Sequence, residues 1–246
     1  MAFIILPPVY IECFMPRPVN SGVRRFAWRR LSKILIEMIT AEDIKTIFES
    51  SEFKSDLEEL SSYAANIRQE RPIVHLFAKN FWRRHHKFAL EKKRCDLVVD
   101  ETRVEFKFHF DYDMLSLQKE LDRYNGDVES LMEAVSKKEL SPTWTVSPGI
   151  YKDVIVKRPD IFVWVLCARN LSNLTKDEIS RVCIGAHQRK YNSHRPYESN
   201  REFLDVADGF LAKLQELRKF SLEKATISTN GSFPSVYHLR VCDFAD

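Results

Sequence analysis

The stretch that decides the fold reads Arg94-Cys-Asp-Leu-Val-Val-Asp-Glu-Thr-Arg-Val-Glu-Phe-Lys-Phe-His-Phe110. Apolar and polar residues alternate on both sides of Asp100-Glu101, a pattern typical of two β-strands joined by a tight turn. If these two residues form the loop, Asp96 faces Glu105 across the hairpin. Asp-Glu is not the favoured turn sequence, so a longer loop with a shifted register is also compatible with the sequence.

Side chains alternate between the two faces of a strand, so this register divides the hairpin into an apolar and a charged face. The apolar face holds Cys95, Leu97, Val99, Val104, Phe106, Phe108 and Phe110. The other face holds Arg94, Asp96, Val98, Arg103, Glu105, Lys107 and His109. The first face is expected to lie in the core. The simplest interpretation of the second is an ordinary solvent-facing surface.

A second interpretation of the charged face is chemical. Asp96 and Glu105 lie opposite each other and should repel unless a cation offsets their charge. Carboxylate oxygens are the ligands that Mg²⁺ prefers, and the ion keeps other positions for water and phosphate. Lys107 on the same face could orient or deprotonate the attacking water, or neutralise charge on the phosphate. The spacing is therefore what metal-assisted phosphodiester hydrolysis requires.

The rest of the chain alternates between helical and strand periodicity. Helices are expected over 23–39, 41–50, 53–69, 72–85, 112–123, 127–138 and 205–220, and strands over 87–91, 160–168 and 235–242, besides the hairpin. The strand at 160–168 is apolar throughout, which predicts burial on both faces. A purely helical interaction protein would require that the hairpin does not form.

The motif Asp96…Glu105-Phe-Lys107 resembles the Asp…(Asp/Glu)-x-Lys motif of the PD-(D/E)XK nuclease superfamily, the fold of many restriction endonucleases. The resemblance covers roughly residues 72–168. It implies that Asp96 and Glu105 bind metal and that Lys107 is the catalytic lysine. It also implies Mg²⁺ as cofactor with Mn²⁺ as a substitute, DNA as partner, and a homodimer.

The expected fold is α/β, with a restriction-endonuclease-like core (a mixed central sheet flanked by helices) and helical additions at both ends. Residues 1–71 would form a helical extension packed on the core, and residues 72–246 the nuclease core with a C-terminal helix and strand. The expected function is that of a divalent-metal-dependent endonuclease of restriction type. The alternative is a non-catalytic nucleic-acid-binding or assembly module on the same fold.

Nucleic-acid contacts are expected at two sites. The net charge of +3 is too small to indicate a nucleic-acid binder by itself, so the distribution of charge matters more. One basic cluster, including Arg83, Arg84 and Lys87, precedes the hairpin and suits backbone phosphates. A loop with Gln188, Arg189 and Lys190 could contact base edges. The aromatic and basic run at 24–30 is more simply explained as a half-buried helix.

Four other polar residues are weaker candidates for functional roles. Glu70 is expected to be a capping or solvated residue, and Gln118 an ordinary helix-surface residue. His109 is expected either at the rim of the site or idle in solvent, and Asp160 at the start of a strand. The five cysteines are scattered, which predicts buried thiols in a reducing cytoplasm. No apolar run is long enough to predict a membrane span.

Overall fold

The computed structural model describes residues 38–63, 70–92, 94–139, 146–169, 200–230 and 235–244. The chain divides into two units, and all described residues belong to the second, Glu37–Asp246. The expected helix at 23–39, except its last two residues, lies outside the described residues. The expected recognition loop with Gln188, Arg189 and Lys190 also lies outside them.

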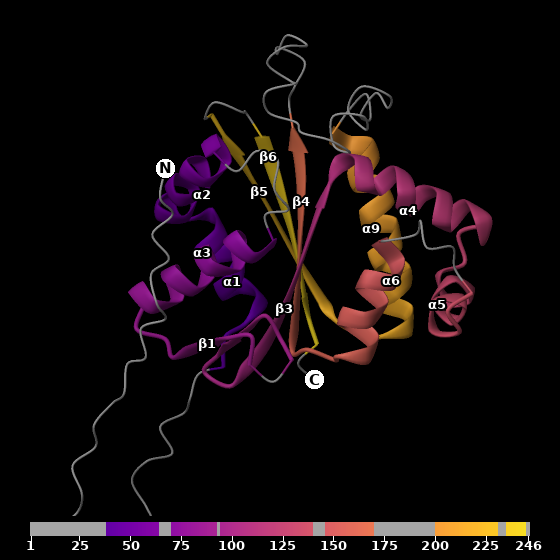
Figure 1. Ribbon diagram of the computed structural model, residues 1–246, viewed down its shortest axis with the longest axis horizontal. Helices are drawn as coiled ribbons and strands as arrows, with labels where there is room; N and C mark the ends of the chain where they lie inside the picture. The colour runs from indigo at the N-terminus through magenta and orange to yellow at the C-terminus, as the bar shows by residue number, and fades with distance from the viewer. Residues whose placement is uncertain are drawn as a thin grey trace, which may run out of the picture. The chain divides into compact units, whose positions relative to one another are not determined.

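A six-stranded mixed sheet forms the centre of this unit, in the order β1-β2-β3-β4-β6-β5 (Figure 1). The strands are β1 (Phe88–Leu90), β2 (Leu97–Val99), β3 (Thr102–Phe110), β4 (Ile161–Arg169), β5 (Ser221–Thr229) and β6 (Ser235–Asp243). β3 and β4 run parallel, and the other neighbouring pairs are antiparallel. The expected mixed sheet flanked by helices is thus confirmed.

Helices cover both faces of the sheet (Figure 1). One face carries α1 (Ala41–Glu49), α2 (Ser51–Tyr63) and α3 (Glu70–Arg83). The other carries α4 (Asp111–Arg123), α5 (Val128–Ser136), α6 (Val146–Ile150), the π-helix η1 (Tyr151–Val156) and α9 (Asn200–Leu217). None of the helices in the described ranges is long and apolar enough to cross a membrane.

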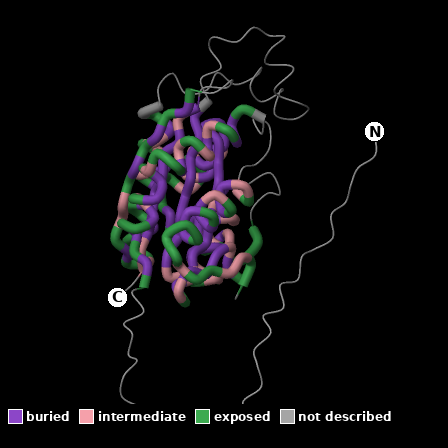
Figure 2. Tube along the Cα trace, turned by 90° about the vertical axis from the view of Figure 1, so that its left-hand side faces the viewer, coloured by how far each residue is buried: buried purple, intermediate pink, exposed green. Residues whose placement is uncertain are grey.

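Two apolar cores follow from this layering. In β4, Val163 and Val165 pack toward the α1–α3 side, and Phe162 and Trp164 pack toward the other side. The expected burial of this strand on both faces is confirmed. Figure 2 shows the same pattern as buried segments running through the centre of the unit.

The hairpin has the expected register, with Leu97 opposite Val104 and a two-residue loop. Asp100 and Glu101 adopt φ angles of 45° and 75°, the positive values that a tight hairpin turn of this type requires. All seven residues of the expected apolar face are buried, Cys95 among them.

The interpretation of the second face as an ordinary solvent-facing surface is wrong for Glu105 and His109, although Arg94 on this face is exposed. Helices on the side of the sheet that carries α4 to α9 cover these two residues, so Glu105 is only 2% exposed and His109 only 6%. His109 is neither a rim residue nor idle in solvent. Its Nδ1 accepts a hydrogen bond from Trp164 Nε1 at 2.9 Å.

The N-terminal part of the described unit packs on the sheet, and the C-terminal part adds strands to it. The residues of α1 and α2 share the core of the sheet, and the backbone amide of Ala41 donates to the Asp243 carboxylate at 3.2 Å. Strand β5 was not expected, because only Ala225, Ile227 and Thr229 alternate as buried residues in a largely polar segment. Its partner β6 and helix α9 lie close to their expected ranges.

Two smaller expectations concern the cysteines and Asp160. Cys95, Cys167 and Cys242 are buried free thiols, as expected. Asp160 immediately precedes β4, and its carboxylate accepts hydrogen bonds from the backbone and guanidinium of Arg103.

Candidate active site

Strand β3 has an open edge beyond the point where β2 ends, because β2 pairs only with its first three residues. Side-chain carboxylates take the place of the missing strand. The Phe106 amide donates to Asp96 Oδ2 at 2.8 Å, and the Phe108 amide donates to Glu70 Oε2 at 3.2 Å. Amides two residues apart point to the same side of a strand. Asp96 and Glu70 therefore line one edge, although 26 positions separate them in the sequence.

Glu70 reaches this edge as the first residue of α3. A carboxylate in the first turn interacts favourably with the positive end of the helix dipole. The residue is half-buried, and burial raises the pKa of its carboxyl. The structure therefore brings Glu70 to the candidate site, where the sequence indicated only a capping or solvated residue.

Glu105 is the buried carboxylate of the site. Its Oε1 contacts the ammonium of Lys157, whereas its Oε2 has no hydrogen-bond partner among the described residues. A buried oxygen without a partner destabilises the native state by an amount comparable to a lost hydrogen bond. The side chain is therefore only half satisfied and is suited to accept a further cation.

Lys107 projects from β3 between two acidic side chains. Its Nζ lies 2.8 Å from Asp153 Oδ2 and 3.6 Å from Glu70 Oε2. Gly149 in α6 leaves room for the stem of this lysine, because a Cβ at that position would lie 3.2 Å from Lys107 Cε. The lysine is thus held in place by charge on two sides and by close packing on a third.

Asp153 and Lys157 complete the cluster, and the sequence did not indicate either of them. Both come from η1 and the residue after it, and Lys157 Nζ lies 3.0 Å from Asp153 Oδ1. π-helical turns are rare and occur often at functional sites. The signal available in the sequence is an Asp and a Lys four residues apart, just before the most apolar strand.

Charge within the cluster shifts several pKa values. The pKa of Glu105 is raised to about 8, mainly by burial and further by the charges of Asp96 and Asp153, and Lys157 offsets only part of this rise. Burial acts to lower the pKa of Lys107, but Glu70 and Asp153 outweigh it and raise that pKa. Lys107 therefore remains protonated at neutral pH, and it acts as a fixed cation rather than as a base.

A pH-dependence of stability follows from Glu105. Its native pKa lies above the ordinary 4.5, so its contribution to stability is complete below about pH 4.5 and lost as the pH rises through about 8. Metal-free protein should lose roughly 4 kcal/mol between pH 5 and pH 9 on account of this group. Glu105→Gln should remove that loss, which melting curves at both pH values would measure. An equal loss of stability in Glu105→Gln would contradict the raised pKa of Glu105.

The donor set of the site is compatible with Mg²⁺ but is not a complete cage. Asp96 and Glu105 supply hard oxygens, including the unpartnered Oε2 of Glu105. No group of three or more His, Cys, Asp or Glu side chains that could hold a metal ion exists within the described ranges. Glu70 Oε2 already accepts from the Phe108 amide and lies 3.6 Å from the Lys107 ammonium. Two carboxylates with water and phosphate oxygens are thus the set that fits.

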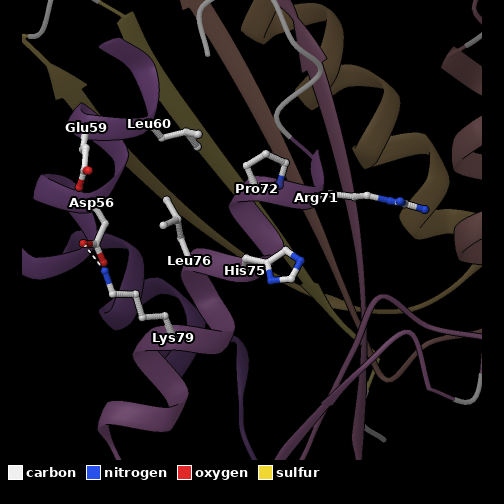
Figure 3. A pocket seen from close by; sticks show the side chains of 8 residues that line it. All are labelled: Asp56, Glu59, Leu60, Arg71, Pro72, His75, Leu76 and Lys79. Atoms are coloured by element: carbon white, nitrogen blue, oxygen red, sulfur yellow. Dashed lines mark hydrogen bonds and ion pairs between the residues drawn. The ribbon is translucent and has the colours of Figure 1, made fainter. Parts of the chain in front are cut away.

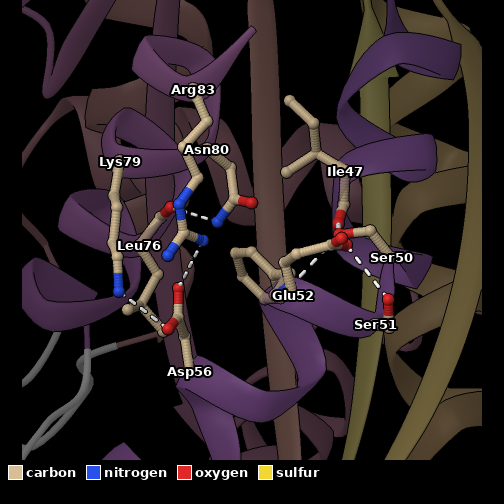
Figure 4. Close-up of polar contacts among 10 residues, drawn as sticks. Ile47, Ser50, Ser51, Glu52, Asp56, Leu76, Lys79, Asn80 and Arg83 are labelled. Carbon is tan, nitrogen blue, oxygen red and sulfur yellow. Dashed lines mark hydrogen bonds and ion pairs between the residues drawn. The ribbon is translucent and has the colours of Figure 1, made fainter.

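The basic cluster before the hairpin lies at the other end of α3, roughly 20 Å from Glu70 along the helix axis. Arg83 is engaged elsewhere, because its guanidinium binds Asp56 of α2 at 3.1 Å (Figure 4). Arg84 and Lys87 are exposed, and the neighbouring Trp82 is 67% exposed. The structure does not bring Arg83 to the carboxylates of the candidate site. It leaves Arg84 and Lys87 as the accessible cations of the basic cluster.

A hollow of about 410 Å³ lies between α2 and α3 (Figure 3). Its lining includes Asp56, His75 and Lys79, and the Lys79 ammonium binds Asp56 at 2.7 Å. None of the residues around Glu105 lines it. This hollow is therefore separate from the candidate site.

Comparisons with protein-family models, with curated proteins and with solved structures found no match for this chain. The resemblance to the PD-(D/E)XK superfamily therefore rests on the motif itself.

Proposed function

We propose that the chain is a divalent-metal-dependent nuclease with a restriction-endonuclease-like core, which hydrolyses phosphodiester bonds of DNA. The observation that carries this proposal is the buried Glu105, with one unpartnered oxygen, beside Asp96 and Lys107 at the open edge of β3. Burying a carboxylate that lacks a full set of partners destabilises a fold. Such an arrangement is typical of a site shaped for a ligand.

Each side chain has a role in this proposal. Asp96 and Glu105 would hold Mg²⁺, which when bound supplies an activated water and polarises the phosphate. Lys107 is a fixed cation that stabilises negative charge developing on the phosphate. Asp153 orients Lys107 through the 2.8 Å ion pair. Glu70 holds the edge of β3 in place through the Phe108 amide.

A non-catalytic nucleic-acid-binding module is the second candidate. The observation that favours it is that the ammonium of Lys157 already compensates one oxygen of Glu105. Supercoiled plasmid and end-labelled linear DNA and RNA, each incubated with Mg²⁺, Mn²⁺, Ca²⁺ or EDTA, separate the two functions. The nuclease is expected to cut DNA with Mg²⁺ or Mn²⁺ and not with EDTA, whereas the module would bind DNA and leave it intact.

Backbone contact by the exposed cations gives a prediction on binding. We expect Arg84→Ala together with Lys87→Ala to weaken DNA binding for all sequences. Each lost phosphate contact should flatten the slope of log affinity against log salt by about 0.9. Fluorescence anisotropy at several salt concentrations measures this slope. Lys137→Ala, which removes an exposed lysine paired with Glu133 on α5, is the control. An unchanged slope in the double variant would contradict the assignment.

A further inference from the structure

A second lysine occupies the position where a metal ion would compete for Glu105. Lys157 Nζ contacts Glu105 Oε1 and lies 3.0 Å from Asp153 Oδ1. The Lys157 side chain is 21% exposed, whereas the side chains of Glu105 and Asp153 are 2% and 3% exposed. The ammonium therefore lies at the boundary between the buried carboxylates and solvent.

Negative charges outnumber positive charges around Lys157. Among the described residues, four carboxylates (Glu70, Asp96, Glu105 and Asp153) lie near two ammonium groups, those of Lys107 and Lys157. Asp153 binds both lysines, one through each oxygen. A divalent cation would balance the remaining charge. The same cation would repel an ammonium bound to the same carboxylate.

We propose that Lys157 is an internal competitor of the metal ion. Lys157 binds Glu105 in the metal-free protein and releases it when a divalent cation binds. The inference rests on the metal site of the proposed function. Asp153 gives the released ammonium a second partner, so that Lys157 can leave Glu105 without being left unpaired. Lys157 is thus a positioning residue that sets how tightly the site binds metal.

The test compares Mg²⁺ binding, without nucleic acid, by the wild type and by Lys157→Met. Isothermal titration calorimetry and Mg²⁺-dependent melting curves at pH 8.5 are the measurements. Removing the competitor should tighten Mg²⁺ binding on the order of tenfold. The metal-free variant should also melt lower than the wild type, because Glu105 and Asp153 lose a counter-ion. Lys152→Met removes an exposed lysine from the adjoining helix η1 and should change neither quantity.

Each outcome separates this inference from the nuclease assignment. Mg²⁺ affinity that is unchanged or weaker in Lys157→Met overturns the competition, whether or not the wild type cuts DNA. Tighter Mg²⁺ binding in a protein that never cuts DNA supports the competition and contradicts the nuclease. If Lys157→Met does not fold, Lys157→Gln keeps a hydrogen bond to Glu105 without the charge and is expected to shift affinity in the same direction.

Discussion

Replacing Glu105 by Gln or Asp96 by Asn is expected to lower the rate of DNA cleavage by at least about a hundredfold. Either change removes one of only two carboxylates that fit the metal, while nearly keeping the shape of the side chain. Cleavage of supercoiled plasmid over time measures the rate. Glu91→Gln removes an exposed carboxylate that pairs only loosely with Arg71, at 3.5 Å, and should cut normally.

Melting curves separate a catalytic role of these carboxylates from a structural one. Mg²⁺ should stabilise the wild type in proportion to its occupancy of the native state, and either variant should lose most of that stabilisation. Asn at position 96 can still accept from the Phe106 amide, so the metal-free variant should lose at most about 1 kcal/mol. A large fall in melting temperature that is independent of metal would make Asp96 a structural residue instead.

Trp164→Ala is expected to have the largest effect on stability. The ring is fully buried in β4 and packs edge-on against His109 and Phe210, with centroids 5.9 Å and 6.2 Å away. Removing a buried aromatic side chain costs about 3–5 kcal/mol, and His109 would also lose its hydrogen-bond donor. The melting temperature should fall by roughly 6–20 °C.

Trp82 provides a matched control for this prediction. It is 67% exposed at the end of α3, and Trp82→Ala should change the melting temperature by no more than about 2 °C. Circular dichroism on heating measures both variants. An equal fall in melting temperature in Trp164→Ala and Trp82→Ala would contradict the burial of β4 between two apolar cores.

The hairpin could be predicted from sequence because its determinants are local. A period of two in Arg94–Phe110 fixes which side chains share a face, and the two-residue loop fixes the register. Glu105 and Lys107 therefore share one face of β3, whereas Asp96 precedes β2 and its carboxylate accepts from the Phe106 amide at the strand edge. Burial of the charged face depends on helices distant in sequence, which the alternation does not encode.

Other parts of the site depend on contacts between distant segments. Glu70 reaches the site because β2 is short and leaves the Phe108 amide without a strand partner, which no local pattern reveals. Asp153 and Lys157 depend on a π-helical turn that packs against β3. Arg83 was expected to contact DNA, and its ion pair with Asp56 depends on how α2 packs against α3.

The most direct test of the central claim is incubation of supercoiled plasmid with the wild type and Glu105→Gln, each with Mg²⁺ and with EDTA. The proposed nuclease predicts conversion to nicked and linear DNA only by the wild type with Mg²⁺. Cleavage by the wild type in EDTA, or normal cleavage by Glu105→Gln with Mg²⁺, would contradict the assignment of a metal-dependent active site around Glu105.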